Sequence, residues 1–501
     1  MRMKKPDLYF WGFIFTALLL GLPSYFAWFR SPFLVTYHEF DFFLGQFTPI
    51  GVHSPESLVL LGYLIYMALM LGQGWCYYRI LLGATEDPGN SQSPLGWKTC
   101  LLAVAPVFFY VPWFSPDVFF YFGTGWIQSA HHFDPYARII ADAPDFPQAP
   151  VYLNVLPSWK YITTPYGPWF VLLMRGLVQL TQGNVFLSLF VLKGVFTGLH
   201  LLNMQLARGI ARELNMNERA TALCFLFNPV LLLCYIGCCH NDILLLSLGL
   251  GSVLFLLRKN HVVCFALLAL GAGYKYVPIL MVPCFLVFFM RGEWQPRSLL
   301  KAAGLMLLFT LLTLTPSLFF PKGISNFIRL LLGRDQLTVN FLYILPTAFL
   351  VNTGLIKMVV LKMALKSCFV VIYGMLLLRL LRKQKGAEAT DLFSTITLIF
   401  LFYFTVGSPE IHEWYVGWFL IFIFWINQKR YFLAGLILSV GIPTLVIWTG
   451  PRLGICRLFG WVGVFFLLWF CLHLLLLNRK YSMQPSPLFG CPFKLKDPKA
   501  N

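Results

Sequence analysis

Charged residues are scarce in this 501-residue chain: they make up 12% of it, whereas they make up about a quarter of an ordinary soluble domain. Hydrophobic residues make up 58% of the chain, and the mean hydropathy is +0.72. Acidic residues are scarcest, at 20 against 38 Lys and Arg, and the formal net charge is +18. The basic residues lie in short clusters between apolar runs, as in membrane proteins. We therefore predict an all-α polytopic membrane protein without a nucleic-acid partner.

Several motifs of soluble enzymes are also missing. The chain has no GxxxxGK[ST] phosphate loop, no HExxH zinc helix and no GxSxG nucleophile elbow. Its twelve cysteines lie mostly inside apolar runs without paired metal-ligand spacing, and the adjacent Cys238 and Cys239 cannot form an unstrained disulfide. No internal repeat of the kind found in many transporters is visible. Any site must therefore be built from loops between membrane segments.

Apolar runs near the length of a membrane crossing recur along the whole chain. We place about fourteen transmembrane helices, at roughly 8–28, 57–80, 99–114, 185–207, 221–239, 242–257, 262–274, 277–290, 299–320, 357–380, 392–407, 414–427, 431–449 and 458–477. The short basic loops fall on one side if both termini are cytoplasmic. This predicts one polytopic domain over residues 1–480, in the plasma or inner membrane, and a cytoplasmic tail at 481–501.

Two segments depart from simple crossings. Residues 168–182 are too short to span a membrane and carry Arg175, so we expect an interfacial or re-entrant helix on the outer side. Residues 262–290 are flanked by basic clusters at both ends, which requires two crossings with Lys275 at the turn. The first of these would be a half-length helix, which is tolerated where it lines a cavity or packs inside protein.

A polar stretch at residues 112–168 forms a large predicted outer loop between the third and fourth spans. Asp117 lies at its start, in the motif SPDVFFY. A carboxylate at this position could act as a general base toward a hydroxyl or could hold a metal. Alternatively, Asp117 together with Ser115 caps a helix that begins at Val118.

The end of this loop, WKYITTPYGPW at 159–169, is rich in aromatic side chains and turn residues. Tyr166 and Trp169 could form a platform for a sugar ring, because pyranoses present flat C–H faces to aromatic rings. The alternative is an aromatic belt at the membrane interface.

Polar residues interrupt apolar runs at two further places on the predicted outer side. His240, Asn241 and Asp242 follow one another between two apolar runs, where ionisable groups are costly and mark functional sites; a capped polar turn is the alternative. Lys275 is a lone cation at a helix end, and it could neutralise a lipid phosphate or simply anchor the helix at the interface.

A last polar cluster, SPEIHEWYVGW at 408–418, holds two carboxylates and a histidine, Glu410, His412 and Glu413. A purely structural turn rarely uses such residues, so we expect a functional role. Arg334 and Arg452 lie on the outer side against the positive-inside expectation. An anionic ligand in the outer leaflet, or lipid headgroups, would account for them.

Taken in order, these motifs resemble a known family. SPDVFFYFGTGWIQSAHHFDPY, TTPYGPW, FNPVLLLCYIGCCHND, the Lys275 helix end and HEWYVGW resemble the GT-C class of polyprenyl-phosphate-sugar-dependent glycosyltransferases, and in particular the bacterial polyprenol-phosphomannose-dependent α-1,6-mannosyltransferases. The resemblance implies transfer of a hexose, mannose, to a glycan or glycolipid acceptor on the outer face during cell-envelope glycan biosynthesis. It implies Asp117 as the base. The class often has two adjacent carboxylates, whereas Val118 follows Asp117 here, so a divalent metal remains an open alternative.

The expected reaction is a single displacement with inversion, for which one base and stabilisation of the leaving phosphate suffice. We assign donor-phosphate binding to Lys275, His240, Arg334 and Arg452, and sugar or acceptor binding to Tyr121, Tyr166, Trp169, Asn241, Asp242, Glu410, His412 and Tyr415. A transporter or flippase of a lipid-linked or anionic substrate is the main alternative, since broken helices and intramembrane charges occur there too. The third hypothesis is a polymerase or ligase that moves whole glycans from a lipid pyrophosphate. Polar residues gathered on one face favour an enzyme.

Overall fold

The computed structural model describes residues 5–30, 56–85, 95–112, 117–143, 159–290, 294–325, 357–383, 388–408, 412–446 and 466–476, with single residues at 115, 145, 328 and 354. The regular structure of these residues is entirely helical, which confirms the all-α prediction. Three predicted site residues, Glu410, Arg334 and Arg452, lie outside the described residues, as does the predicted tail at 481–501.

The longer helices are α1 (Lys5–Arg30), α3 (Glu56–Thr85), α4 (Trp97–Phe108), α5 (Asp117–Ser129), α7 (Pro168–Leu180), α8 (Val185–Glu213), α9 (Glu218–Leu226), α10 (Asp242–Leu257), α11 (His261–Tyr274), α12 (Val282–Met290), α13 (Pro296–Leu314), α16 (Met358–Lys383), α17 (Ala389–Phe402), α18 (Gly417–Ile423) and α19 (Lys429–Val446). Short turns of 3-10 helix occur at η2 (Ile140–Asp142), η3 (Trp159–Tyr161), η5 (Val277–Leu280), η6 (Thr315–Phe319) and η10 (Glu413–Val416). Two π-helices, η4 (Leu231–Gly237) and η9 (Tyr403–Gly407), interrupt the α-helical pattern.

Four segments are long and apolar enough to cross a membrane: α8, Pro296–Phe319, α16 and Ala389–Gly407. All four coincide with predicted spans. A fifth span is possible if α9 and η4 count as one segment bent by 52°. Most of the other apolar helices have ten to 17 residues, among them α10, α11 and Phe466–Leu476. The described residues therefore support four or five spans by length and composition, and the predicted total of about fourteen is not established.

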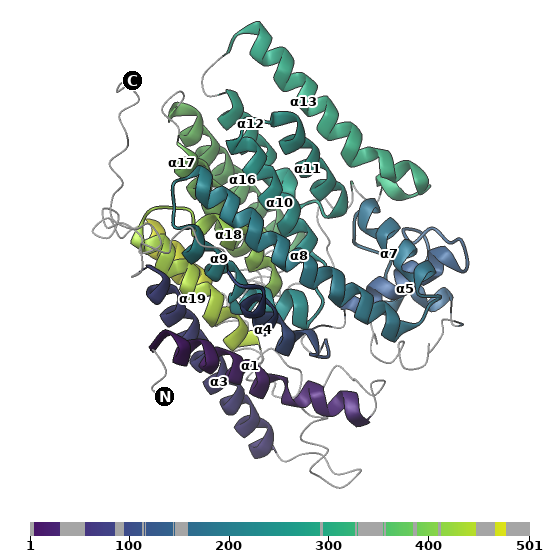
Figure 1. The fold of residues 1–501 in the computed structure, drawn as a ribbon. Coiled ribbons are helices and arrows are strands. Elements are labelled where there is room, and N and C mark those ends of the chain that lie inside the picture. The colour runs from purple at the N-terminus through teal and green to yellow at the C-terminus, as the bar shows by residue number, and fades with distance from the viewer. Residues whose placement is uncertain are drawn as a thin grey trace.

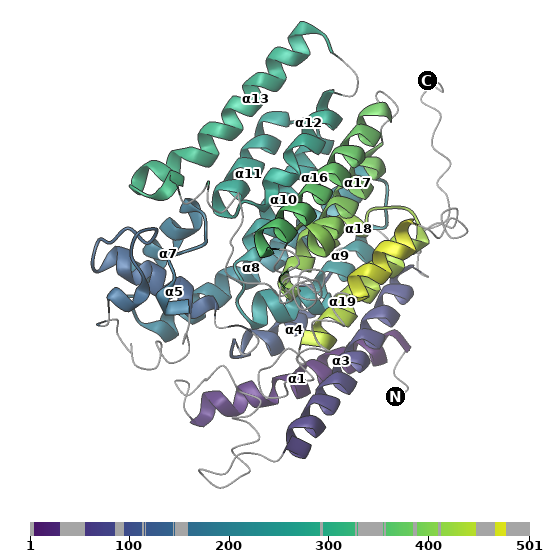
Figure 2. The ribbon, with the colours of Figure 1, turned by 180° about the vertical axis from the view of Figure 1, so that it is seen from behind.

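The helices form a bundle with a smaller helical unit at one edge (Figure 1). α10 packs between α8 and α11, and α11 in turn packs on α13. α5 and α7 pack together at the edge of the bundle, close to the end of α13 (Figures 1 and 2). On the opposite side, α1 packs on α3, α3 on α19, and α16 on α17.

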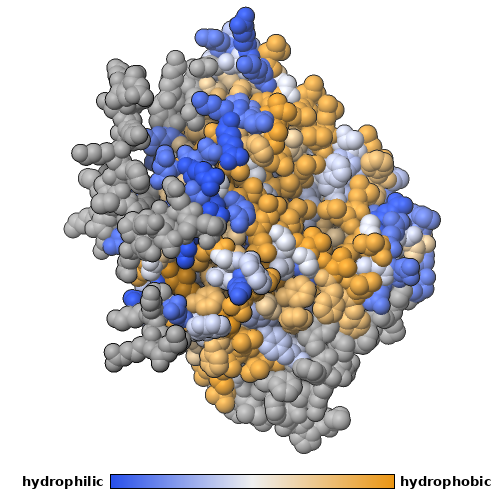
Figure 3. Space-filling view, viewed as in Figure 1, coloured by the Kyte–Doolittle hydropathy of each residue, from blue (hydrophilic) through white to orange (hydrophobic). Residues whose placement is uncertain are grey.

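Apolar side chains cover much of the outside of this bundle. α16 exposes Met363, Val370 and Val371, each more than 60% accessible. Figure 3 shows apolar residues over the middle of one face, with hydrophilic residues gathered toward its edges. Such a distribution suits a surface that contacts lipid in its middle and water at its ends.

The break between α9 and η4 follows from the local sequence. Pro229 lacks a backbone N–H, and the side chain of Asn228 accepts hydrogen bonds from the N–H groups of Val230 and Leu231 at 3.1 and 3.3 Å. An Asn that satisfies the first N–H groups of a helix begins a new helix. The chain therefore bends between α9 and η4, and η4 leads into the polar turn at 240–242.

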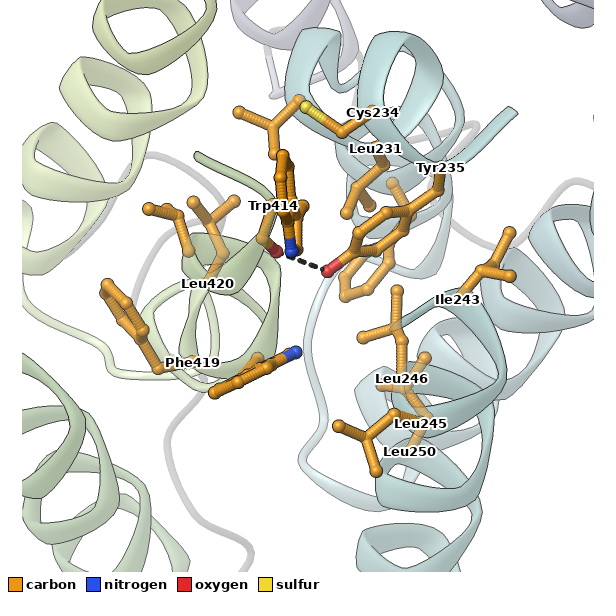
Figure 4. Packing of buried hydrophobic residues seen from close by; sticks show 14 of the residues in the cluster. Leu231, Cys234, Tyr235, Ile243, Leu245, Leu246, Leu250, Trp414, Phe419 and Leu420 are labelled. Atoms are coloured by element: carbon orange, nitrogen blue, oxygen red, sulfur yellow. Dashed lines mark hydrogen bonds between the residues drawn. The ribbon is translucent and has the colours of Figure 1, made fainter. Parts of the chain in front are cut away.

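The core beside this turn lies between η4, α10 and α18 (Figure 4). Leu246 and Leu250 of α10 and Phe419 of α18 are buried in it. The hydroxyl of Tyr235 donates to the carbonyl of Trp414 at 2.9 Å, which joins η4 to η10. This contact fixes two polar clusters, 240–242 and 412–418, relative to each other although they are far apart in sequence.

Candidate active site

Asp117 begins α5 with its carboxylate turned into the protein. Its backbone N–H donates to the hydroxyl of Ser115 at 3.3 Å, so Ser115 caps the chain at this point. The side chain is 6% exposed. Its Oδ2 accepts a hydrogen bond from the Tyr166 hydroxyl at 3.3 Å and lies 3.8 Å from Nδ1 of His240. The carboxylate therefore faces two predicted site residues from other segments.

A close backbone approach brings Tyr166 to this position. The N–H of Gly167 donates to the carbonyl of Tyr274 at 2.9 Å. A Cβ at position 167 would lie only 2.2 Å from the carbonyl oxygen of Gly273, so no other residue fits without a shift of the backbone. The TTPYGPW motif is thus held against the end of α11, where Lys275 follows.

His240, Asn241 and Asp242 form the tight turn between η4 and α10. Cys239, just before it, has a left-handed backbone with φ of 60°. The imidazole of His240 stacks on Trp414 with ring centroids 3.7 Å apart. The hydroxyl of Tyr274 donates to the carbonyl of Asn241 at 2.9 Å.

Tyr121 of α5 reaches the same turn. Its hydroxyl lies 3.5 Å from Nδ1 of His240 and also 3.5 Å from the backbone nitrogen of Asn241. The Tyr121 ring packs edge-on against Tyr166 and Phe170. The phenol therefore links the helix that carries Asp117 to the turn that carries His240.

Lys275 and Asp242 form a buried ion pair. Lys275 Nζ lies 2.7 Å from Asp242 Oδ1, and the indole N–H of Trp418 donates to the same oxygen at 2.7 Å. Asp242 is 0% exposed and Lys275 is 8% exposed. The ammonium lies 4.9 and 5.0 Å from the ring centroids of Tyr415 and Trp418, within the range of cation–π attraction. The carboxylate and the two rings therefore hold the cation in place.

Several buried polar atoms of the turn have no hydrogen-bond partner among the residues that the structure describes. They are Nε2 of His240, both side-chain amide atoms of Asn241, and Oδ2 of Asp242. Buried polar groups are almost always hydrogen-bonded, so a cluster of unsatisfied donors and acceptors marks a place for a polar ligand. A sugar offers hydroxyl groups that both donate and accept.

The second polar cluster, 412–418, packs against His240 and Lys275. The His412 imidazole stacks on Trp414 at 4.5 Å, and Tyr415 stacks on Trp418 at 4.3 Å. Glu413 is buried beside them. These residues surround the ion pair and the His240 turn with aromatic surface.

Burial shifts the protonation of the acidic groups. It raises the pKa of Asp117 to about 6, although Ser115 and Lys275 oppose the shift. It raises the pKa of Glu413 to about 8, and the nearby charge of Asp117 adds to this effect. Burial and the charge of Lys275 lower the pKa of His412 to about 3. At neutral pH the arrangement therefore favours an ionised Asp117 beside a protonated Glu413 and a neutral His412.

Not all of the site residues predicted from the sequence lie in this cluster. Trp169 points to α13, where its indole N–H donates to the carbonyl of Leu312 at 3.1 Å. The sequence motif at 408–418 indicated Glu413 and Trp414 without a specific role for either, and neither Trp418 nor Lys193 was predicted to belong to the site. A lone lysine inside the apolar run 185–207 was a usable signal, because ionisable groups within a span are rare.

A divalent metal gains no support from these residues. The part of the chain that the structure describes contains no group of three or more His, Cys, Asp or Glu side chains that could hold a metal ion. Asp117 and His240 make only a pair, and Asp242 is paired with Lys275. No step proposed below uses a metal.

The chain is similar to one protein family and to two individual proteins, all described as α-(1→6)-mannopyranosyltransferases. The family described as α-(1→6)-mannopyranosyltransferase, N-terminal domain, matches residues 40–291, half of the chain. The α-(1→6)-mannopyranosyltransferase A of Corynebacterium glutamicum is 29% identical over 220 residues, which cover 43% of this chain and 44% of that protein. The protein of the same name from Mycobacterium tuberculosis is 25% identical over 400 residues, which cover 74% of this chain and 70% of that protein.

The match thus spans less than half of the corynebacterial relative and a larger part of the mycobacterial one. No solved structure matches the chain. The matched residues 40–291 include Asp117, Tyr166, the His240 turn and Lys275, but not the cluster at 412–418. On this match, the chain belongs to the α-(1→6)-mannopyranosyltransferase family.

Proposed function

We propose that the protein is a GT-C-type membrane glycosyltransferase that moves a hexose, mannose, from a polyprenyl-phosphate donor to a glycan or glycolipid acceptor. One observation carries the proposal: Asp117, Tyr166, the turn residues His240 and Asp242, and Lys275 come from four segments and meet in a single buried cluster. The family match supports mannose as the sugar. We place the site at the outer face of the plasma or inner membrane, with both termini in the cytoplasm.

In the proposed reaction Asp117 removes the proton from an acceptor hydroxyl. The oxygen attacks the anomeric carbon, the bond between that carbon and the phosphate oxygen breaks, and polyprenyl phosphate leaves with the electron pair. A single displacement inverts the configuration at the anomeric carbon. The ionised state expected for Asp117 near neutral pH supports its role as the base, because a base works best with a pKa near the working pH.

The remaining side chains bind and orient the two substrates. We assign the donor phosphate to Lys275 and His240; Arg334 and Arg452 are further candidates for it outside the described residues. The unsatisfied atoms of Asn241 and Asp242 suit sugar hydroxyls. Tyr121, Tyr166, His412, Tyr415 and Glu410 remain our candidates for contacts with donor or acceptor, whereas Trp169 is directed to α13. With Asp242 on one side and the phosphate on the other, Lys275 would bridge two anions, and its charge would oppose the charge that builds up on the leaving group.

The direct test supplies reconstituted protein with radiolabelled polyprenyl-phosphate mannose or polyprenyl-phosphate glucose and a glycolipid acceptor. We expect label to appear in the acceptor from the mannose donor and not from the glucose donor, because the family match names mannose. Transfer from glucose alone would correct the sugar and keep the reaction. If neither label is transferred but labelled lipid changes leaflet, the protein is a transporter and the proposal fails.

A further inference from the structure

Lys193 is a buried lysine in the first third of α8, one of the candidate membrane spans. It is 1% exposed. Its Nζ donates to the carbonyl oxygens of Ile236 and Gly237, each at 2.8 Å. No described carboxylate forms an ion pair with it. An ammonium in such a place is costly unless hydrogen bonds compensate for the loss of water, and such residues are usually functional.

The two acceptors are the last residues of the π-helix η4. The final carbonyls of a helix lack partners within the helix, and cations near them are stabilising. Lys193 therefore caps η4 from a neighbouring helix. The four-carbon side chain of Lys193 is long enough for its ammonium to reach from α8 to the carbonyl oxygens of η4.

The chain changes direction directly after the capped carbonyls. The N–H of Cys238 donates to the carbonyl of Leu233 at 2.8 Å, and the N–H of His240 donates to that of Cys234 at 3.2 Å. Between them Cys239 has a φ of 60°, a conformation that non-glycine residues rarely adopt. Only these two cysteines separate Gly237 from His240, so the end of η4 sets the place of the turn.

We propose that Lys193 is a positioning residue for the turn His240–Asn241–Asp242. By donating to Ile236 and Gly237 it fixes the end of η4, and thereby the distance of His240 from Asp117 and the approach of Asp242 to Lys275. It touches neither sugar nor phosphate. Its effect on transfer rests on the proposed function, whereas its effect on the turn does not.

Lys193→Met removes the ammonium and keeps an unbranched apolar side chain. We expect kcat per folded molecule to fall about 10- to 100-fold, because a displacement of about 1 Å in a catalytic group has effects of this size. The KM for the acceptor should change less than about twofold, as acceptor contacts are not the cause. Lys193→Arg keeps a charged donor and should recover at least part of the loss.

Asn203→Leu is the matched control. Asn203 is a buried polar residue on the same helix, ten positions further along, and its side-chain amide forms no hydrogen bond with the described residues of η4. Removing its amide tests whether any loss of buried polarity in α8 lowers kcat. We expect kcat within about twofold of the native value, since the cap on η4 is untouched.

A second readout needs no sugar. Cys238 and Cys239 are at most 1% exposed, and so is Cys264 on α11. Alkylation with a membrane-permeable maleimide, mapped by mass spectrometry, should speed up at Cys238 and Cys239 in Lys193→Met and stay slow at Cys264. Asn203→Leu should leave all three slow.

The outcomes separate the inference from the proposed function. Faster labelling of Cys238 and Cys239 in Lys193→Met supports the inference even if the native protein transfers no sugar. Equal acceleration at Cys264 would indicate general unfolding and would overturn a local role. A folded Lys193→Met protein with native labelling and native kcat would also overturn it.

Discussion

Asp117→Asn is expected to lower the rate of sugar transfer about 10²- to 10⁴-fold, the usual contribution of a general base. Asn has nearly the same shape as Asp, and its side-chain oxygen can still accept the hydrogen bond of the Tyr166 hydroxyl. Its amide cannot take the acceptor proton. The initial rate at saturating donor, normalised to folded protein, measures the effect.

Asp145→Asn is the control for this variant. Asp145 belongs to the same predicted outer loop, but its side chain is 61% exposed and pairs with His131 at 2.7 Å. Exposed pairs of this kind contribute about 1 kcal/mol or less, so we expect nearly native activity. Native rates in both variants would remove Asp117 from the role of base.

The pH dependence of transfer gives a second view of Asp117. Burial raises its pKa to about 6, and only the ionised carboxylate can accept a proton. The value of kcat/KM should therefore rise with pH through about 6 and fall about tenfold for each pH unit below it. The residual activity of Asp117→Asn should lack this acidic limb.

Lys275→Met is expected to destabilise the protein strongly. The fully buried Asp242 carboxylate then keeps the hydrogen bond from the Trp418 indole N–H but loses its cation. Removing one member of a buried ion pair typically costs about 3–5 kcal/mol, because the other charge stays buried and uncompensated. A lower Tm and a smaller yield of folded protein in detergent should report the loss.

The double variant Lys275→Met with Asp242→Asn distinguishes pairing from packing. It removes both charges, so its Tm should lie closer to the native value than that of Lys275→Met alone. Its transfer activity should stay low, because the proposed contacts to phosphate and sugar are both gone. If Lys275→Met alone keeps the native Tm, the ion pair does not hold the turn in place.

The sequence predicted part of the fold from run length. α8, α16 and the segment Ala389–Gly407 were expected because long apolar stretches with few charges have few alternatives. The stretch 221–239 looked like one span, yet it bends by 52° where Asn228 and Pro229 interrupt the helix. Run length is insensitive to such a bend, which depends on local hydrogen bonds.

The candidate site was predictable as a set of segments and not as a set of contacts. The order of polar motifs indicated that Asp117, His240 and Lys275 belong together. Lys275 pairs with Asp242 beside aromatic rings because α11 and α18 both pack against α10, and no local sequence pattern encodes that packing. Lys193 was overlooked because its apolar surroundings were interpreted only as a membrane span.

The most direct test of the central claim counts the leaving group. Reconstituted protein is given radiolabelled polyprenyl-phosphate mannose, and free polyprenyl phosphate and labelled acceptor are measured together, with and without the acceptor. We expect one polyprenyl phosphate released for each sugar transferred, only when acceptor is present, and almost none of either with Asp117→Asn. Loss of label from one leaflet without release of polyprenyl phosphate, at the same rate in both proteins, would contradict a glycosyltransferase built around Asp117.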